Sequence, residues 1–265
     1  MMTFDFSGKK AIVIGAGSGI GKAIAMQFAD NGADVWIGDI ANENAKAVVD
    51  EMQQKYGKSY GYTVTNVADK GDISNLFDEA KASFGEINIV VNSAGVFLPT
   101  PLLEATPEEI KNHLDINLMG VVYGCQLALD TMIEQGKGGK IVNISSVGGR
   151  RGGKGATFYA LGKSAIINFT QSAALTGAEY GINVNAICPG IIRTPMWDTI
   201  LDYASSTRSG ADKDDIFNHM VDERTPLGRA QTAEEMAYAV AFLCSDYANV
   251  IVGQSLNVCG GDSMN

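Results

Sequence analysis

A tyrosine and a lysine stand four residues apart in the segment Phe158–Ser164, and a serine precedes the tyrosine by thirteen residues. Side chains at this spacing share one face of a helix, although such pairs also arise by chance on exposed helices. A phenol with its ordinary pKa of about 10 is a poor base at neutral pH, but a neighbouring ammonium group favours the phenolate. Tyr159 and Lys163 can therefore exchange a proton with an alcohol or a carbonyl, while Ser146 hydrogen-bonds the same oxygen.

A glycine-rich turn follows the first apolar run of the chain, Lys10–Ile14, and leads directly into a helical pattern. Its glycines, at positions 15, 19 and 21, have the spacing G-x-x-x-G-x-G rather than G-x-G-x-x-G. Glycine lets a backbone turn sharply, approach a pyrophosphate and direct the amides of a helix N-terminus at it. Taken alone, the turn is equally compatible with a tight loop, but its place between the first strand and the first helix favours a dinucleotide site.

An acidic residue, Asp39, ends the second apolar run about twenty residues after these glycines. A carboxylate at this place accepts hydrogen bonds from the hydroxyls of an adenosine ribose and repels a 2′-phosphate. The sequence therefore predicts NAD as the cofactor, with NADP less favoured. Lys22 and Lys46 can add positive charge nearby, so we expect a preference for NAD rather than its exclusive use.

The overall composition favours small-molecule chemistry. The formal net charge of -10 opposes binding to nucleic acids and to anionic membrane surfaces. The four cysteines form no C-x-x-C pair and the two histidines have no neighbours at metal-ligand spacing, so we expect neither a disulfide framework nor a metal site. Without a signal-peptide pattern or a stretch of about 18 uninterrupted apolar residues, the expected location is the cytoplasm.

Short apolar runs alternate with longer helical patterns along the whole chain. Most of the runs are continuously apolar, as in strands that are buried on both faces of a parallel sheet. The predicted strands are Lys10–Ile14, Asp34–Gly38, Tyr60–Val64, Ile87–Asn92, Lys140–Ser145, Asn183–Ile187 and Ser255–Val258, and the clearest helices are Ile20–Asn31, Glu43–Tyr56, Glu108–Gln135 and Phe158–Tyr180. This order predicts an α/β fold: a single-domain, Rossmann-type, doubly wound parallel sheet of about seven strands over residues 1–265.

One segment, Pro195–Pro226, interrupts the alternation. Its apolar residues recur at roughly helical intervals on both sides of a polar stretch, which predicts two short helices ahead of the last helix and strand. Insertions beyond the carboxyl ends of the strands often act as lids over a ligand. We therefore expect a small helical lid, the alternative being a surface excursion that packs on its own core.

The order of the motifs resembles the classical short-chain dehydrogenase/reductase family. The resemblance rests on the glycine-rich turn, N-S-A-G at Asn92–Gly95, the asparagine of D-I-N-L-M-G, I-S-S, Y-x-x-x-K and C-P-G, and it covers essentially the whole chain. It implies an enzyme that interconverts an alcohol and a carbonyl compound. It also implies a catalytic tetrad of Asn117, Ser146, Tyr159 and Lys163, in which Asn117 holds a water of a proton relay behind the lysine.

The cofactor site follows from the glycine turn, Asp39 and this resemblance. Tyr159 and Lys163 belong to it together with Gly15, Ser18, Gly19, Ile20, Gly21, Asp39, Asn66, Val67, Asn92, Ala94, Gly95, Pro189, Gly190, Ile192 and Thr194. Asn66 stands where the family commonly has an aspartate that meets the adenine amine, and its amide oxygen can accept the same hydrogen bond. The resemblance further implies a homotetramer in which Glu108–Gln135 and Phe158–Tyr180 face a partner across a two-fold axis.

The substrate is predicted from a basic loop between Ser146 and Tyr159. The cations of this loop, Arg150, Arg151 and Lys154, can hold hydroxyls or an anionic group, although Gly-Arg runs are often solvated loops. This string and the T-P-M-W start of the lid, which contains Trp197, are similar to sorbitol, galactitol and 2,3-butanediol dehydrogenases within the family. We therefore expect a small polyol, diol or sugar alcohol.

Four other functions stay open at this point. A hydroxysteroid such as a bile acid would lie under Trp197, Tyr203, Phe217 and Met220. A 3-oxoacyl reductase generally needs NADP, which Asp39 opposes. An extended-family epimerase or dehydratase usually brings a larger C-terminal substrate domain, and a non-catalytic NAD-sensing scaffold would be expected to lose a member of the tetrad.

Overall fold

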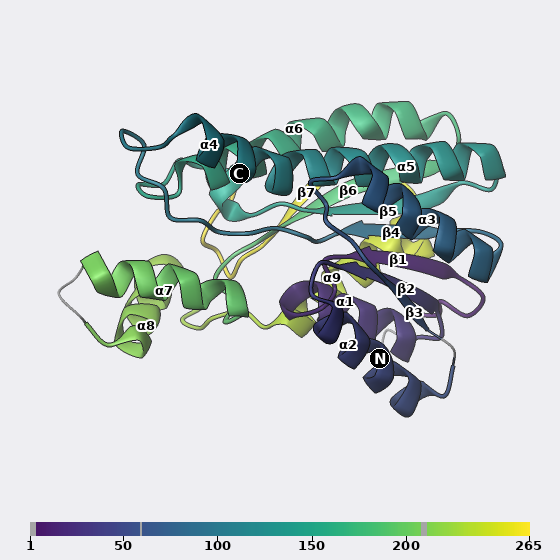
Figure 1. The fold of residues 1–265 in the computed structure, drawn as a ribbon, viewed down its shortest axis with the longest axis horizontal. Coiled ribbons are helices and arrows are strands. Elements are labelled where there is room, and N and C mark those ends of the chain that lie inside the picture. The colour runs from purple at the N-terminus through teal and green to yellow at the C-terminus, as the bar shows by residue number, and fades with distance from the viewer. Residues whose placement is uncertain (1–3, 59, 208–210) are drawn as a thin grey trace.

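The computed structural model describes residues 4–58, 60–207 and 211–265. Seven strands form one sheet with the order β3-β2-β1-β4-β5-β6-β7, and all neighbouring strands are parallel (Figure 1). The strands are β1 (Lys10–Ile14), β2 (Asp34–Asp39), β3 (Gly61–Val64), β4 (Ile89–Asn92), β5 (Gly139–Ile144), β6 (Ile182–Pro189) and β7 (Ser255–Val258). The prediction of a Rossmann-type, doubly wound α/β fold is confirmed; β1 and β7 have the predicted ends, and the ends of the other strands differ by at most two residues.

The central strands consist of residues that neighbours bury on both faces of the sheet. All four residues of β4 and all eight of β6 are buried, and so are four of the five in β1. The edge strands β3 and β7 are only partly buried. The continuous apolar runs in the sequence therefore mark the interior of a parallel sheet.

Helices cover both faces of this sheet. One face shares an apolar core with α1 (Gly19–Asp30), α2 (Asn42–Tyr56) and α9 (Ala233–Cys244); the other shares a second core with α3 (Lys70–Phe84), α5 (Gly120–Gln135) and α6 (Thr157–Ala178). The strand order reverses between β1 and β4, which are neighbours in space but not in sequence. In folds of this kind the crevice at the carboxyl ends of two such strands is the place where ligands bind.

The helix predicted over Glu108–Gln135 has a wider turn in its middle. It consists of α4 (Pro107–Leu114), a π-helical turn (Asp115–Met119) and α5, and the turn contains the buried side chain of Asn117. Such turns within helices often occur at functional sites. By length and composition alone, the stretch 107–135 is able to cross a membrane, but half of its most apolar window is buried inside the protein, as in the core helices of many proteins.

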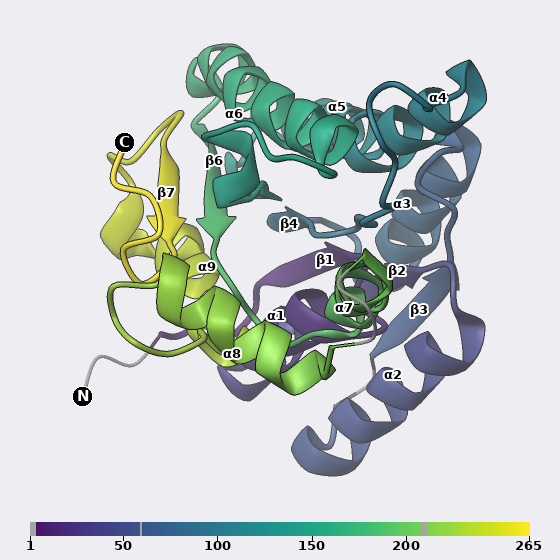
Figure 2. The same cartoon turned by 90° about the vertical axis from the view of Figure 1, so that its left-hand side faces the viewer.

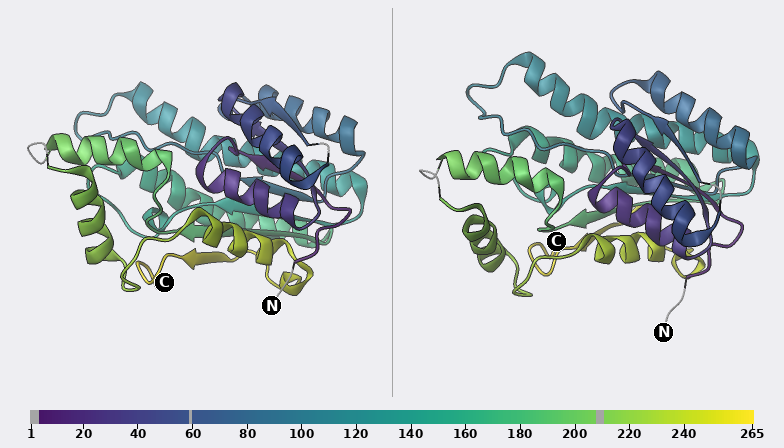
Figure 3. Two further views of the ribbon diagram at one scale, coloured as in Figure 1. Left: turned by 90° about the horizontal axis from the view of Figure 1, so that it is seen from below. Right: turned by 60° about the horizontal axis from the view of Figure 1, so that its bottom comes forward.

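The segment predicted to form two short helices does so. α7 (Pro195–Thr207) and α8 (Lys213–Arg224) lie beyond one end of the sheet, apart from the helices that cover its faces (Figures 2 and 3). They share a small core of their own, in which the rings of Trp197 and Phe217 meet edge to face at 5.2 Å between centroids. The first residues of α7 also line the cavity described next, so this segment both packs on itself and borders the candidate site.

Candidate active site

A cavity of about 450 Å³ lies between the carboxyl ends of the strands and the start of α7. The predicted residues that line it are Gly15, Ser18, Gly19, Ile20, Gly21, Asp39, Asn66, Val67, Ala94, Gly95, Ser146, Tyr159, Lys163, Pro189, Gly190, Ile192, Thr194 and Trp197. The glycine-rich turn and the Tyr–Lys pair, which are far apart in the sequence, therefore open into one space.

The glycine-rich turn is shaped by close backbone contacts. Gly15 has a φ of +81°, and a Cβ atom there would lie 2.5 Å from the backbone of Ala94. A Cβ atom on Gly21 would lie 2.0 Å from the carbonyl oxygen of Gly15. These positions exclude every side chain, so the turn stays tight against the start of α1 and leaves room for a ligand to approach its amides.

Asp39 is held at the edge of the cavity by two backbone amides. Its carboxylate accepts hydrogen bonds from the amide of Gly17, at 2.7 Å, and from the amide of Ala41, at 2.9 Å. A Cβ atom on Gly17 would lie 2.7 Å from the carboxylate carbon, so the contact needs a glycine there. Sequence reasoning assigned no role to Gly17, although its place within the glycine-rich turn was a usable signal.

The two lysines expected to add positive charge near Asp39 are both paired with acids on α2. Lys22 lies 2.7 Å from a carboxylate oxygen of Glu51, and Lys46 lies 2.6 Å from one of Asp50. Neither lysine lines the described cavity. The charge facing the cavity at this end is therefore the carboxylate of Asp39.

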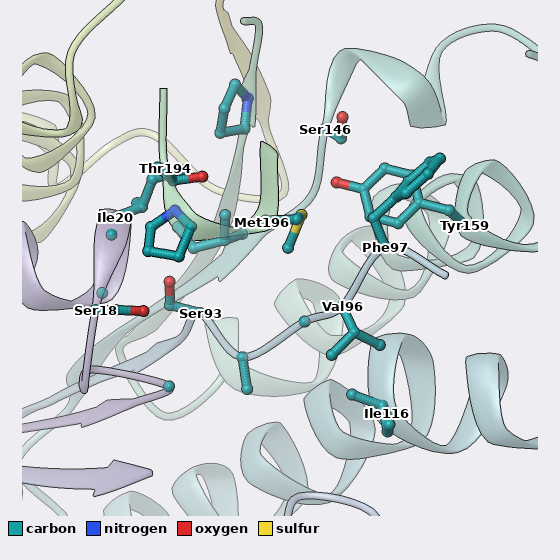
Figure 4. Close-up of a pocket in the computed structure, with 18 of the residues that line it drawn as sticks. Ser18, Ile20, Ser93, Val96, Phe97, Ile116, Ser146, Tyr159, Thr194 and Met196 are labelled. Carbon is teal, nitrogen blue, oxygen red and sulfur yellow. The ribbon is translucent and has the colours of Figure 1, made fainter. Parts of the chain in front are cut away.

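Tyr159 and Ser146 both line the other end of the cavity, and Figure 4 shows them next to one another. Ser146 follows β5 and Tyr159 lies in the first turn of α6. Burial raises the pKa of Tyr159, and the hydrogen bond with Ser146 opposes this rise. Burial is therefore the largest influence on the pKa of this phenol.

Lys163 is buried beneath the tyrosine. Its Nζ atom donates a hydrogen bond of 2.9 Å to the carbonyl of Ile144, at the end of β5, and lies 5.7 Å from the centroid of the Tyr159 ring. Burial lowers the pKa of Lys163 to about 8. The ammonium group is thus fixed between the sheet and α6, and it loses its proton more readily than an exposed lysine.

Asn117 lies behind the cavity wall and not on it. Its Oδ1 atom accepts a hydrogen bond of 3.0 Å from the amide of Val96, and its buried Nδ2 atom has no partner among the described residues. A Cβ atom on Gly95 would lie 3.0 Å from Asn117 Oδ1 and 3.3 Å from Lys163 Nζ. Glycine at position 95 therefore lets Asn117 and Lys163 approach the same point.

An apolar wall completes the cavity near Tyr159. It comes from the irregular segment after β4, the π-helical turn and the start of α7, with the residues Val96, Phe97, Leu98, Ile116, Met196 and Trp197. Phe97 packs edge to face against Tyr159, with 5.6 Å between ring centroids, and both rings appear together in Figure 4. Of these residues only Trp197 was predicted from the sequence. Val96, Phe97 and Leu98 lie in an irregular segment, which has no periodic pattern to mark it.

The basic loop does not reach this cavity, so the substrate contacts predicted for it are corrected. Arg150 donates to the side chain of Asn257, at 3.1 Å, and to the carbonyl of Ser255. Arg151 forms an ion pair with the buried carboxylate of Asp262, which also pairs with Arg224 at 2.9 Å. Lys154 is exposed and lies outside the cavity wall. The arginines attach the loop to the C-terminal segment instead of facing the ligand space.

The predicted contact of Asn92 with the cofactor is corrected in the same way. Its side chain is buried and donates a hydrogen bond of 2.8 Å to Asn143, which in turn donates to Thr170 at 3.0 Å. Asn92 therefore connects β4, β5 and α6 below the cavity.

Among the described residues there is no cluster of three or more metal-ligating side chains.

Comparison with known proteins agrees with this geometry. A family model described as enoyl-(acyl carrier protein) reductase matches residues 15–263. The chain is 36% identical to a 3-oxoacyl-acyl-carrier-protein reductase of Thermotoga maritima, covering 96% of this chain and 97% of that protein. It is 34% identical to an (S)-acetoin-forming diacetyl reductase of Staphylococcus epidermidis, covering 96% of this chain and 98% of that protein. It is 35% identical to a sorbitol dehydrogenase of Cereibacter sphaeroides, covering 97% and 98%.

Two solved structures have the same fold over nearly their whole length. Levodione reductase matches with a TM-score of 0.90 and 30% identity, covering 97% of this chain and 98% of that one. L-sorbose reductase from Gluconobacter frateurii, solved with NADPH and L-sorbose, matches with a TM-score of 0.91 and 28% identity, covering 98% of both chains. These relatives differ in substrate but share one architecture and one class of reaction.

Proposed function

Because this chain belongs to the short-chain dehydrogenase/reductase family of oxidoreductases that act on CH–OH groups, we propose that it interconverts a small neutral secondary alcohol and its ketone with NAD. The observation that carries the proposal is the neighbouring pair of Ser146 and Tyr159, in one cavity with the glycine-rich turn and Asp39. Family members use NAD or NADP, so the preference between the two cofactors is part of the proposal.

The cavity fits a dinucleotide. Gly15, Gly19 and Gly21 leave the backbone bare where a pyrophosphate would approach the start of α1, and Asp39 presents its carboxylate to the same space. Since Lys22 and Lys46 are paired elsewhere, a 2′-phosphate would meet negative charge without compensation from them. When bound, the nicotinamide of NAD accepts or supplies the hydride.

The residues of the chain manage the proton. In oxidation Tyr159, as phenolate, takes the proton of the substrate hydroxyl while Ser146 holds the same oxygen; in reduction Tyr159 returns the proton to the carbonyl oxygen. The Lys163 ammonium, fixed on the Ile144 carbonyl, favours the phenolate by its charge. Asn117, whose buried Nδ2 atom has no hydrogen-bond partner within the described part of the chain, suits the proposed relay through water.

The cavity wall favours a neutral substrate. Asp39 and Lys163 are the charged side chains among the described lining residues. Asp39 lies at the end with the glycine-rich turn, and Lys163 is buried. Beside Ser146 and Tyr159 the wall is apolar, with Phe97, Met196 and Trp197. This combination favours a short diol or polyol with an alkyl or methylene group next to the reacting carbon, and disfavours a substrate that needs an anion site.

A hydroxysteroid is less well supported, because three of the four aromatic or apolar residues expected under its rings, Tyr203, Phe217 and Met220, lie outside the described cavity wall. A 3-oxoacyl reductase stays an alternative, since several relatives have that name. We retain the cytoplasm as the expected location, Pro195–Pro226 as a lid within a single domain, and a homotetramer with α5 and α6 at an interface.

A screen of NAD⁺ reduction with 2,3-butanediol, sorbitol, galactitol, their phosphates and bile acids tests the proposal. We expect the neutral diols and polyols to have the highest kcat/KM and their phosphates to be poor substrates. A bile acid preferred by more than about 100-fold, the discrimination that a few apolar contacts supply, would make the protein a hydroxysteroid dehydrogenase. If no alcohol or ketone turns over with either cofactor, the protein is a binding module instead.

Light scattering tests the proposed homotetramer. A mass equal to that of the 28.0 kDa monomer would contradict it.

A further inference from the structure

Helix α4 has a buried histidine, His113, which the proposed chemistry does not use. Only 1% of its surface is exposed. Its Nε2 atom lies 2.8 Å from the carbonyl oxygen of Leu98 and 3.3 Å from the hydroxyl of Thr100, both in the irregular segment after β4. Because a carbonyl oxygen only accepts hydrogen bonds, Nε2 is the protonated nitrogen and donates to Leu98.

The imidazole is neutral in this place. Its Nδ1 atom is buried and has no partner among the described residues, so a second ring proton would have no acceptor. Burial lowers the pKa of His113. The Leu98 carbonyl and the carboxylate of Glu109, one turn earlier on α4, raise the pKa by a smaller amount. A buried polar ring costs free energy unless its hydrogen bond is made, so the bond to Leu98 is the reason the side chain is tolerated there.

His113 and Asn117 lie four residues apart along one continuous helix, and they hydrogen-bond the backbone on either side of Phe97. Asn117 accepts from the amide of Val96, at 3.0 Å, and His113 donates to the carbonyl of Leu98. The Phe97 ring between these anchors packs against the ring of Tyr159. His113 also lies 6.0 Å, between ring centroids, from Phe158, the neighbour of Tyr159 in α6. The histidine thus contacts both the apolar wall and the helix that carries the tyrosine.

We propose that His113 is a positioning residue of the active site: by holding the Leu98 carbonyl it keeps Phe97 against Tyr159 and so selects substrates with an apolar group next to the reacting carbon. This inference rests on the proposed function and identifies the element that gives its substrate preference. Without the hydrogen bond, the segment 96–100 keeps the Asn117 anchor but loses the second one, and the Phe97 ring no longer has a fixed place.

Two substitutions separate the hydrogen bond from the volume of the ring. His113→Leu removes the donor, whereas the amide nitrogen of His113→Gln reaches the same carbonyl and does not titrate. At pH 8 we expect His113→Leu to raise KM for 2,3-butanediol about fivefold, the factor that corresponds to a hydrogen bond of about 1 kcal/mol, with kcat reduced less than twofold. We expect His113→Gln to stay within about twofold of the wild type in both constants.

The control is the other histidine of the chain, His219, which is exposed on α8 and pairs with Glu223. His219→Gln should leave both constants unchanged. The affinity for NADH, measured by fluorescence, should be the same in all variants, because His113 lies behind the wall at the Tyr159 end of the cavity, where it contacts Leu98. In His113→Leu, kcat/KM for 2,3-butanediol should also fall relative to that for glycerol, since glycerol lacks the methyl groups.

Hydrogen exchange gives a second readout that needs no activity. Amides of residues 96–100 should exchange faster in His113→Leu than in the wild type, and His113→Gln should restore their protection. If His113→Leu leaves KM and this exchange unchanged, or if His113→Gln is as impaired as His113→Leu, the positioning role is wrong. If the wild type turns over no alcohol, the proposed function fails, and the exchange measurement still decides whether His113 holds the wall.

Discussion

The two ends of the cavity are built in different ways. At the end formed by the glycine-rich turn and Asp39, the proposed adenosine end, the contacts come from the backbone: bare glycines at the start of α1, and amides of Gly17 and Ala41 that hold Asp39. At the substrate end they come from side chains on an irregular segment, a π-helical turn and the first turn of α7, with Phe97 and Met196 among them. We expect the first end to hold the pyrophosphate and the ribose of a dinucleotide, which all family members need, while the second is free to vary. This difference accounts for relatives with one fold and several substrates.

The largest effect should come from the residue proposed to transfer the proton at the substrate end. Tyr159→Phe removes the proton-transferring hydroxyl and keeps the ring against Phe97, so kcat should fall roughly 10²–10⁴-fold. NADH should bind with unchanged affinity. Steady-state kinetics and fluorescence titration check both expectations. The matched variant Ser146→Ala leaves the tyrosine in place and should also lose activity. Retained activity in both variants would show that the chemistry occurs elsewhere.

The pH dependence sharpens the same prediction. Oxidation needs the phenolate, and burial raises the pKa of Tyr159, so kcat/KM for the alcohol should rise with pH into the alkaline range. Reduction needs the phenol and should become slower as the pH rises. Lys163, whose pKa burial lowers to about 8, loses its charge above that pH and with it part of its support for the phenolate. A profile that is flat in both directions would contradict proton transfer by Tyr159.

A smaller effect is expected at the adenosine end. Asp39 should give a preference for NAD over NADP of at least about 10-fold in kcat/KM, because its carboxylate repels a 2′-phosphate. Asp39→Ala should reduce this preference by improving the KM for NADP, with kcat nearly unchanged. Steady-state kinetics with NAD and with NADP measure this preference. Gly17 and Ala41 donate to Asp39, so Asp39→Asn keeps an acceptor for these amides and separates the charge from the structure of the turn. Equal use of both cofactors by the wild type would contradict the assignment.

The sequence predicted the lining of the cavity at the glycine-rich turn far better than its lining near Tyr159, for a physical reason. Glycine spacing and an acid at a strand end are local features, so the site at β1, α1 and β2 could be inferred from short motifs. The same holds for the parallel sheet, whose buried strands are continuous apolar runs. Residues 96–98 have no such pattern, and only the tertiary packing against His113 and Asn117 brings them to the cavity.

Charge misled the prediction in one place. A run of cations beside Ser146 suggested a polar substrate site, but an arginine is satisfied by any acceptor within reach of its long side chain. In the folded chain those acceptors are Asn257, the Ser255 carbonyl and the carboxylate of Asp262, all near the C-terminus. These acceptors lie about 105 to 111 residues from the loop along the sequence. Local spacing therefore could not predict the contacts of the two arginines.

The smallest kinetic effect should therefore come from this loop, and the reason is structural. Arg150 joins the loop to β7, so Arg150→Ala should lower the free energy of unfolding by about 1–2 kcal/mol, the range for a partly exposed charged donor, while kcat and KM change less than about twofold. Lys154→Ala, at an exposed position, should change stability by less than about 0.5 kcal/mol and serves as the matched control. Urea unfolding and steady-state kinetics on the same preparations measure both quantities. A KM that rises more than about 10-fold at unchanged stability would instead mean that Arg150 reaches the substrate, and the substrate end would then carry a charged contact after all.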